Sequence, residues 1–537
     1  MYMNKILVFT GISAILAGCG GNYGTMTSYS TTATTTPADI QETYLHSTAL
    51  YGSDEAGRSA DIAVLLPLSG PSKTTGNRIK TSIETAFLRK PKSTVKVSFY
   101  DVSGKDEEHE AAISEALSKK PDIIIGPLFA KDAKIVREMK PSRTPVISFT
   151  SDVTALGSGV VTTNLIPTQS VETIVRQMQK DDIKSMIILA PNDDYGQLMT
   201  ATAYLASDIY DIPIKGIFYY TPRNSDSIKD ATMRASMYNT RNAANTRARE
   251  VLSDILTKEQ LSSSDRKSMK NQLEKISRTE TLGDLPYDSI LFLGNGEDSK
   301  TLASFLRYYG VGNKDAAFYG TTVWQDSDIA SDFTMSGAKY ATLPEVSNNF
   351  ISLYNMVGGS EPDHLTAFGY DAANLALGML YAQQSEFEYM YDANGYVGAS
   401  GIFRILDSGE SERGLRIMEL DGSGETLVTQ SAPTNFLVPL YNIHGKNTRK
   451  ISERELSTRG INPGDYITIP DNLRRKSEYR TKTIGANYVS DSDQESQLDE
   501  PIQVFAPADE PVSNPEFESV KSETVSRKYI DSVEIEE

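Results

Sequence analysis

The sequence predicts an α/β protein with two lobes, each a parallel β-sheet flanked by helices. From Asp61 onward, short apolar runs without internal periodicity alternate with helical patterns, as is typical of strands buried on both faces of parallel sheets. The alternation restarts near Thr163, which predicts a second lobe built like the first. A long polar stretch of helical composition, residues 221–283, interrupts the second lobe.

Length, charge and cysteine content exclude several classes of function. At 537 residues, the chain is long enough for two or three domains. Its formal net charge of −18 argues against a general nucleic-acid role. One cysteine allows no internal disulfide, and four histidines that lie far apart give no metal-ligand spacing. We therefore expect no metal, no cofactor and no nucleic-acid partner.

Residues 1–18 have the pattern of a secretory signal, with Lys5 before a mostly apolar run at 6–16. The run is too short to remain as a membrane-spanning helix. It ends in Leu16-Ala17-Gly18-Cys19, which resembles the bacterial lipobox. The resemblance implies cleavage before Cys19 and lipid attachment there, and Gly20 is similar to the outer-membrane sorting pattern. An ordinary signal peptide with an incidental cysteine is the alternative. Residues 19–60, rich in Thr, Ser and Gly, are expected to form a flexible tether.

The first strand and the loop after it set the plan of the first lobe. Residues 62–66 predict a buried strand, and Ile79 and Ile83 follow at helical spacing. The loop at 67–76 contains Ser69 and Gly70. Ligands of open parallel sheets bind at the carboxyl ends of the strands, so this loop is the first candidate wall of a cleft.

The same alternation continues through both lobes. In the first lobe it predicts strands at 95–100, 122–125 and 145–149, with helices at 107–117 and 132–139, and the pattern restarts after 160–163. In the second lobe it predicts strands at 185–189, 214–219, 287–293 and 316–319, with helices at 171–178, 195–207 and 299–309. Farther along, 364–381 is spaced as a helix, and 402–406 with 415–420 is expected to form a hairpin.

The insertion at 221–283 is expected to be a helical hairpin within the second lobe. Its two apolar stripes are separated by Ser262-Ser263-Ser264-Asp265, a turn that leads into a helix N-cap. Residues 223–278 contain 12 Lys/Arg and 7 Asp/Glu in an otherwise acidic chain. Two interpretations remain: a solvated helix pair packed on the lobe, or a docking surface for an acidic partner. The arginines that would carry docking are Arg234, Arg241, Arg247 and Arg249.

Order is expected to decline after about residue 430. Residues 431–490 are expected to form a partly ordered extension, with 435–441 and 466–469 as candidate strands. Residues 491–537 contain 14 acidic and 3 basic residues together with four prolines. This composition predicts a disordered acidic tail.

No motif in the sequence assembles a catalytic site, and we expect no catalytic residue. Gly294-x-Gly296 follows a strand but lacks the third glycine of a dinucleotide loop. As a turn that opens a helix, it presents Asn295 and backbone amides to a ligand. Thr150 and Ser151 offer hydroxyls after a strand, where turn formation is the alternative role. With the first loop, the candidate cleft residues are Ser69, Gly70, Thr150, Ser151, Tyr195 and Asn295.

Several motifs together resemble type I periplasmic binding proteins of the branched-chain amino-acid receptor branch. They are IAVLLPLSG, DIIIGPL, TPVISFTSD, LAPNDDYG and FGYDAA. The resemblance implies a two-lobed binding-protein domain at 61–430, with a first lobe of 61–163 plus 321–383 and a second lobe of 164–320 plus part of 384–430. It adds Asp371, in FGYDAA, to the candidate cleft residues. Amino-acid receptors of this fold hold the substrate with Ser or Thr after the third and fourth strands. Ala130 and Asp152 stand in those places here, which argues against an amino-acid ligand.

One subfamily resembles the chain more closely: the lipoprotein activators of penicillin-binding proteins. The similar segments are YDSILFLGNGEDSKTLASFLRYYGV, YGTTVWQDSDIA and SGAKYATLPE. The resemblance implies a non-catalytic, outer-membrane lipoprotein of a Gram-negative periplasm that binds and activates a peptidoglycan synthase of the penicillin-binding protein class. The alternative is a periplasmic solute receptor of an ABC-type importer, for amino acids or a related small molecule.

Overall fold

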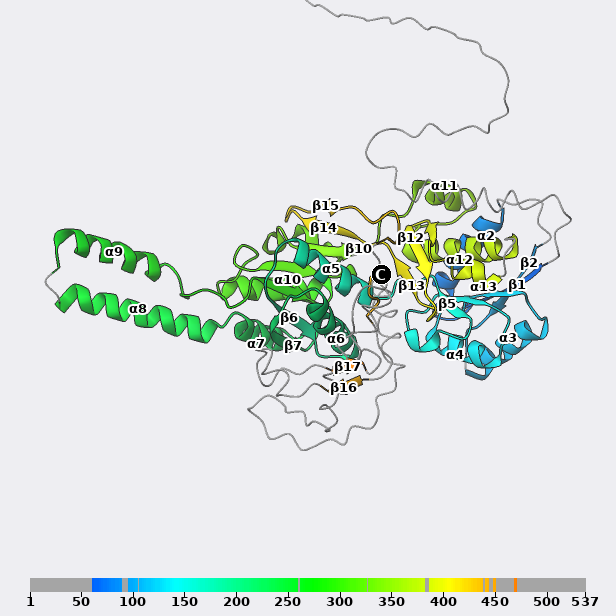
Figure 1. The fold of residues 1–537 in the computed structure, drawn as a ribbon, viewed down its shortest axis with the longest axis horizontal. Coiled ribbons are helices and arrows are strands. Elements are labelled where there is room, and N and C mark those ends of the chain that lie inside the picture. Colours follow the sequence, from blue (N-terminus) through cyan, green and yellow to red (C-terminus); the bar gives the residue numbers. More distant parts are fainter. Residues whose placement is uncertain are drawn as a thin grey trace, which may run out of the picture. The chain divides into compact units, whose positions relative to one another are not determined.

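The computed structural model describes residues 60–88, 95–104, 106–258, 261–325, 327–381, 386–437, 440–443, 448–450 and 468–470. The predicted signal peptide, the lipidation site at Cys19, the tether and the acidic tail lie outside the described residues. Two β-sheets with flanking helices make up most of the described chain (Figure 1).

Sheet A has five parallel strands and forms the first lobe. They are β1 (Ala60–Leu66), β2 (Val95–Asp101), β3 (Ile123–Ile125), β4 (Val146–Ser148) and β5 (Val160–Thr162), in the order β2-β1-β3-β4-β5. The flanking helices are α2 (Lys73–Leu88), α3 (Asp106–Ser118), α4 (Ala130–Met139) and α12 (His364–Tyr381). Val64 of β1 lies in the same core as Ile79 of α2, whereas its neighbour Leu65 lies in the same core as Ile113 of α3. Burial on both faces explains why these strands are continuous apolar runs.

Sheet B has seven strands and forms the second lobe. They are β6 (Met186–Pro191), β7 (Ile214–Tyr220), β8 (Ser289–Phe292), β9 (Ala317–Gly320), β10 (Lys339–Thr342), β14 (Arg416–Leu420) and β15 (Thr426–Gln430), in the order β15-β14-β10-β9-β8-β6-β7. Strands β6 to β10 are parallel, but β14 is antiparallel to both β10 and β15. Sheet B is therefore mixed rather than wholly parallel, with the antiparallel edge that many α/β sheets carry. Its helices are α5 (Thr168–Lys180), α6 (Asp194–Ile209), α7 (Ser225–Ala235) and α10 (Gly296–Tyr308).

The predicted hairpin between 402–406 and 415–420 is wrong. The first segment is β12 (Gly401–Ile405), which pairs with β11 (Tyr396–Gly398) and β13 (Ser411–Arg413) in a small sheet C. The second segment is β14 of sheet B. The sequence does not reveal β13, because Ser411, Glu412 and Arg413 are polar although all three are buried. A polar strand is buried only where its side chains find hydrogen-bond or charge partners.

The chain passes three times between the first lobe and sheet B. The first passage joins β5 to α5, the second joins β10 to α11 (Asn348–Met356) and α12, and the third joins β13 to β14. Strand β10 lies in sheet B, although the expected boundary places residues 321–342 with the first lobe. The remaining elements are α13 (Glu386–Met390), η1 (Val153–Ala155), η2 (Thr322–Trp324), η3 (Asp328–Ser331), η4 (Phe333–Met335), β16 (Thr448–Lys450) and β17 (Thr468–Pro470).

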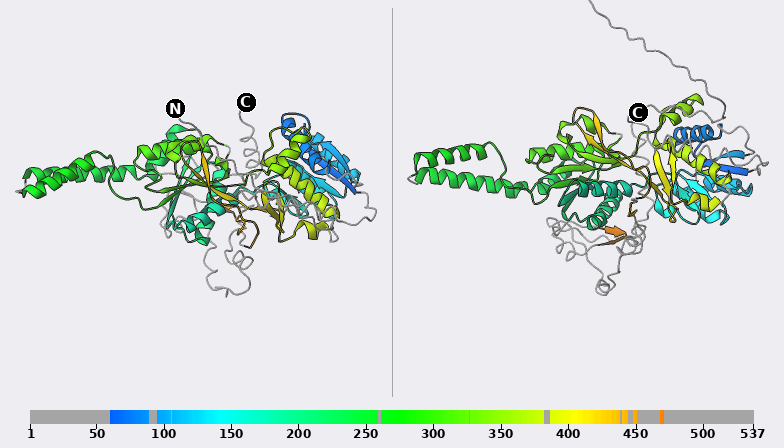
Figure 2. Two further views of the ribbon diagram at one scale, coloured as in Figure 1. Left: turned by 90° about the horizontal axis from the view of Figure 1, so that it is seen from above. Right: turned by 45° about the horizontal axis from the view of Figure 1, so that its top comes forward.

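A pair of helices follows α7 in the second lobe. Helix α7 itself packs on β7 and α10 and buries Ile228 and Ala231, so it is part of the lobe. The next helices, α8 (Tyr238–Lys258) and α9 (Ser263–Ser277), pack on each other beyond α7 (Figures 1 and 2). Ser262 caps α9 by accepting a hydrogen bond from the Asp265 amide, as predicted. No residue of α9 is buried. We call residues 238–278 the arm.

The single tryptophan, Trp324, lies in the core of the second lobe. It is fully buried between Phe292 and Tyr340, whose ring centroids lie 5.8 and 6.1 Å away. Its indole nitrogen donates to the Ser299 hydroxyl at 3.0 Å. A Cβ added to Gly320 would lie 2.4 Å from the indole ring. The close approach of the ring therefore requires glycine at this position.

We expect Gly320→Ala to lower the free energy of unfolding by about 1–3 kcal/mol, because the added methyl group displaces the ring in a packed core. Gly312→Ala is the matched control, since its added Cβ would lie 3.7 Å from Asp315, an ordinary contact. Urea unfolding followed by the fluorescence of Trp324 measures both variants. Equal unfolding midpoints would contradict the packing described for Gly320.

Candidate functional site

The loop after β1 is organised around the carboxylate of Asp101. The amides of Leu68 and Ser69 donate to its Oδ1 atom at 2.7 and 3.3 Å. The Ser103 hydroxyl donates to the same oxygen at 2.6 Å and lies 2.5 Å from the Ser69 hydroxyl. Burial raises the pKa of Asp101, but the hydrogen bonds from Ser103, Ser69 and Leu68 outweigh it and hold that pKa below its ordinary value. Ser69 thus serves a carboxylate of its own chain, and Gly70 beside it takes a positive φ of 70°.

The hydroxyls after β4 serve the local turn. Thr150 is buried, and its hydroxyl accepts a hydrogen bond from the Asp152 amide at 3.0 Å. Asp152 accepts from the amide and the hydroxyl of Thr154 at 2.8 and 2.7 Å and lies 3.2 Å from the Lys134 ammonium. These contacts are turn and cap bonds. Within this loop, Ser151 is half-buried, and no hydrogen bond to its hydroxyl is described.

Polar groups meet at the carboxyl ends of β6, β7 and β8 in the second lobe. Asp193 caps α6 by accepting from a first-turn amide at 2.8 Å, and Asn295 caps α10 by accepting from the Asp298 amide at 2.9 Å. Tyr220 is buried beside them. Burial raises the pKa of Tyr220 well above its ordinary value, and the nearby Asp298, Asp193 and Tyr195 raise it further. The structure thus brings Tyr195 and Asn295 into one neighbourhood, through Tyr220 and Asp298.

Close packing explains the glycine turn at this end of sheet B. A Cβ added to Gly294 would lie 1.8 Å from the Tyr220 hydroxyl. The hydroxyl occupies the space that any larger residue at 294 would need, and among the described residues it has no hydrogen-bond partner. The first glycine of Gly294-x-Gly296 therefore serves packing. The hydrogen bonds described for Ser69 and Thr150 stay within the loops of sheet A.

Asp371 holds a buried arginine instead of facing a cleft, which corrects its place among the candidate ligand residues. It is 2% exposed, and its Oδ1 atom accepts from the Ala399 amide at 2.7 Å. Its Oδ2 atom lies 3.2 Å from Nη2 of Arg413, which is also buried. Both carboxylate oxygens are therefore occupied by this chain. Removing either partner of such a pair leaves an uncompensated charge in the core.

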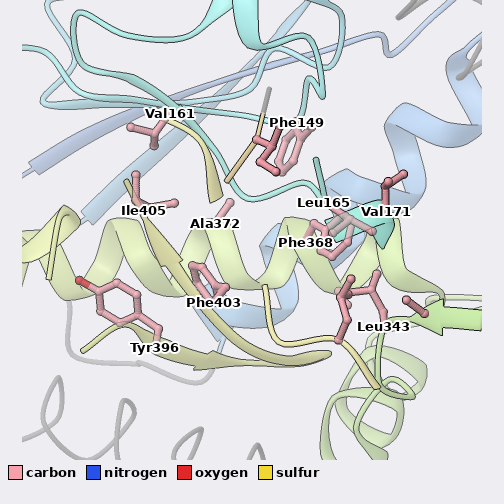
Figure 3. Close-up of a cluster of buried hydrophobic side chains, with 14 of the residues drawn as sticks. Phe149, Val161, Leu165, Val171, Leu343, Phe368, Ala372, Tyr396, Phe403 and Ile405 are labelled. Atoms are coloured by element: carbon pink, nitrogen blue, oxygen red, sulfur yellow. The ribbon is translucent and has the colours of Figure 1, made fainter. Parts of the chain in front are cut away.

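The guanidinium of Arg413 joins the first and third passages between the lobes. Its Nε atom donates to the Thr163 carbonyl at 2.8 Å, and Nη2 donates to the same oxygen. The rings of Phe368 and Phe403 lie 4.1 and 4.9 Å from the guanidinium carbon, within reach of a cation–π interaction. Figure 3 shows both rings within the apolar cluster around α12 and β12. We call Arg413, Asp371 and Thr163 the Arg413 cluster.

Further hydrogen bonds connect β13 to the first passage. The Arg413 amide donates to Oε1 of Gln169 at 3.0 Å, and the Gln169 amide group donates to the Ser411 carbonyl. The Ser411 hydroxyl donates to the Asn164 carbonyl. Each buried donor or acceptor left without its hydrogen-bond partner would lower the free energy of unfolding by about 1–3 kcal/mol. Separating the two passages is therefore unfavourable unless water reaches all of these groups at once.

Residues 440–443, the strap, lie between two buried carboxylates. The Tyr441 and Ile443 amides donate to Glu172 of α5, and a third strap amide donates to Glu412 of β13 at 2.8 Å. Burial raises the pKa of Glu172 to about 7, although the two strap amides act in the opposite direction. The strap thus connects a helix of the second lobe to sheet C.

The four predicted docking arginines divide into two pairs. Arg241 donates to three backbone carbonyls at the base of the arm, at 3.2 to 3.4 Å. Arg234 pairs with Asp230 at 2.9 Å. Arg247 and Arg249 are exposed, and no ion pair with another described residue is found for either. Arg234 is exposed as well, but it is already paired with Asp230.

A groove of about 700 Å³ lies between α8 and α9. Its lining residues are Thr246, Arg249, Glu250, Ser253, Asp254, Thr257, Leu273 and Ser277. The lining is mostly polar, with charges of both signs, unlike the apolar walls typical of small-molecule sites.

In the part of the chain that the structure describes, no three His, Cys, Asp or Glu side chains are grouped to hold a metal ion. No described helix combines the length and the apolar character needed to cross a membrane.

The residues with the most consequential contacts were missed by sequence reasoning. Arg413 and Glu412 lie in a polar strand that the pattern does not mark, and Asp371 was assigned a different role. Glu172 carries a usable signal: it lies on α5, where most residues from 168 to 178 are buried. A carboxylate in the middle of a buried helix predicts a hydrogen-bonding partner from elsewhere in the chain.

We expect Asp371→Ala to lower the free energy of unfolding by about 3–5 kcal/mol, because it leaves the Arg413 charge buried without a partner. The double variant Asp371→Leu with Arg413→Met is expected to be less destabilised. Lys184→Ala at the exposed Lys184–Asp182 pair is the control and should change stability by less than about 1 kcal/mol. Urea unfolding measures all three. A double variant less stable than Asp371→Ala would contradict the assigned role of the pair.

Glu172 makes stability depend on pH between about 4.5 and 7. Because its pKa is raised from 4.5 to about 7, the folded chain keeps a proton in this window that the unfolded chain releases. The free energy of unfolding therefore rises as pH falls through 7 and levels off below 4.5, by at most about 3 kcal/mol in total.

Urea unfolding at about pH 5 and pH 8 measures this difference. Glu172→Gln should abolish the part of the pH dependence of unfolding that Glu172 contributes. Glu115→Gln, on the exposed side of α3, should leave that pH dependence unchanged. The same pH dependence in Glu172→Gln as in the unaltered chain would show that another group is responsible.

Comparison with known proteins shows which sequences and folds this chain is similar to. Residues 59–231 match a family model described as periplasmic binding protein. An uncharacterised protein of Rickettsia prowazekii is 30% identical over 100 residues, which are 18% of this chain and 26% of that protein. The chain thus matches about a quarter of the length of this relative.

Among solved structures, a putative branched-chain amino acid ABC transporter protein from Rhodospirillum rubrum aligns with a TM-score of 0.52 and 14% identity. The alignment covers 69% of this chain and all of that one. The C-domain of LpoA from Haemophilus influenzae, a regulator of PBP1A, aligns at 16% identity over 69% of this chain and all of that one, with a TM-score of 0.46. Similarity at these identities concerns the fold alone. The family match at 59–231 and the two-lobed architecture show that the described chain has the type I periplasmic-binding-protein fold.

Proposed function

We propose that the chain is a non-catalytic lipoprotein on the periplasmic face of the outer membrane, where it binds and activates a peptidoglycan synthase of the penicillin-binding protein class. The observation that carries the proposal is the arm. Five exposed cations on it have no ion-pair partner among the described residues: Arg247, Arg249, Lys267, Lys270 and Lys275. A helix pair that buries so little apolar surface adds little to stability. Its cationic surface suits a protein partner with acidic groups.

The connections between the lobes argue against a solute receptor. Two-lobed receptors close on their ligands by bending at the connecting segments. Gln169 and the strap connect α5 of the second lobe to β13 by buried hydrogen bonds, so a motion that separates α5 from β13 would break them. The side chains expected to meet a ligand also have other partners: Thr150 serves its own turn, and Asp371 holds Arg413.

The anchor and the location rest on the sequence. The lipobox-like motif ending at Cys19 and the stretch at 19–60 support a lipidated tether of roughly 40 residues, with a reach of about 30–40 Å. The proposed organisation is a signal peptide at 1–18, the tether at 19–60, the binding-protein domain at 61–430, an extension at 431–490 and an acidic tail at 491–537.

Activation is tested with the full chain carrying Cys19→Ser, which removes the lipidation site. The readouts are binding to each bifunctional peptidoglycan synthase of the same periplasm and the transpeptidase rate of that synthase. We expect one synthase to bind and to accelerate. Arg247→Glu with Arg249→Glu should weaken binding by at least about tenfold, because both exposed charges reverse.

The matched control is Lys119→Glu with Lys120→Glu, which reverses two exposed charges on the first lobe. This variant should bind as the unaltered chain does. If no synthase binds and no rate changes, the proposal fails. A small solute that raises the free energy of unfolding, by about 2.7 kcal/mol at one hundred times its Kd, would instead support the importer receptor.

A further inference from the structure

The arm and the C-terminal segment of the chain carry opposite charge. Residues 238–278 contain nine Lys/Arg and five Asp/Glu. Residues 491–537 contain three Lys/Arg and 14 Asp/Glu, and they account for −11 of the net charge of −18. Opposite net charges on two segments of one chain favour their association at low ionic strength.

Most of the cations on the arm are not used within the arm. Arg266 donates to the Leu256 carbonyl at 2.8 Å, and Arg278 pairs with Glu274. Arg241 is engaged at the base. The five cations named above remain exposed without a described ion-pair partner. On α9, Lys267 and Lys270 are three residues apart and therefore share one face.

The segment is attached close enough to reach the arm. Strand β17 (Thr468–Pro470) contacts α6, and the strap is bound to Glu172 of α5, so the last described residues lie on the lobe that carries the arm. The roughly 20 residues from 470 to 491 can reach at most about 70 Å, the length of a fully extended chain. Helix α8, with 21 residues, is about 31 Å long.

We propose that residues 491–537 bind along the cationic surface of the arm and occupy it when no partner is bound. Attachment to the same chain gives the segment an effective concentration of about 1 mM or more. Contacts too weak to detect between separate molecules are therefore populated within one chain. The binding is electrostatic, so it weakens as the Debye length falls from about 10 Å at 0.1 M salt toward about 3 Å at 1 M.

The inference rests on the charge of the arm and does not require that the partner be a synthase. It is tested on the full Cys19→Ser chain alone, by carbodiimide cross-linking of carboxylates to lysines followed by mass spectrometry. Lys267, Lys270 and Lys275 are the reporting amines, and Lys119 and Lys120 are the exposed controls. At about 50 mM NaCl, we expect the arm lysines to link to residues 491–537 at least about fivefold more often than the controls do.

Two changes should abolish the excess without removing a reporting amine. The first is about 0.5 M NaCl, and the second is Arg247→Glu with Arg249→Glu. Circular dichroism of the variant checks that its helices remain folded. Equal linking of arm and control lysines, or an excess that survives both changes, would overturn the proposal. Links from the arm of an isotopically labelled copy to an unlabelled copy would also overturn it, by assigning the contact to two molecules.

Discussion

The buried ion pair between Arg413 and Asp371 holds strand β13 beside the first passage between the lobes. Strand β13 is polar along its whole length, yet it is buried where the first and third passages meet. It can stay there only because Asp371, the Thr163 carbonyl and two aromatic rings complete the surroundings of Arg413. An apolar strand of similar volume could be equally stable. The charged version connects α12, sheet C and the first passage, since one guanidinium contacts Asp371 and the Thr163 carbonyl.

The strap extends this arrangement to the second lobe. Glu412, the neighbour of Arg413 in β13, accepts a strap amide, and Glu172 on α5 accepts two more. Two buried carboxylates therefore hold a segment that itself has no regular secondary structure. The strap thus adds a connection between β13 and α5 beside the passages, where two-lobed binding proteins have their hinge.

Local pattern was enough to predict most of the parallel strands and helices, because apolar runs and helical spacing are properties of neighbouring residues. The helix at 364–381 and the cap at Ser262 are confirmed at the predicted residues. Strand β13 and the sheet to which 415–420 belongs could not be predicted, because they depend on partners far along the chain. Arg413 lies 42 residues from Asp371 and 250 residues from Thr163. Of the candidate site, Tyr195 lies near Tyr220, and Asn295 binds Asp298, which is also near Tyr220. Asp371 instead holds Arg413, a partner that its sequence context does not show.

Native-state hydrogen exchange of the full chain tests most directly whether the Arg413 cluster fixes the connection between the lobes. The amides of Ala399 and Arg413 donate to Asp371 and Gln169. We expect them to exchange only through global unfolding, with an opening free energy equal to the free energy of unfolding measured in urea. Exchange of these two amides at a clearly lower free energy, while the strands of sheets A and B stay protected, would contradict the account. The lobes would then separate at this point without unfolding.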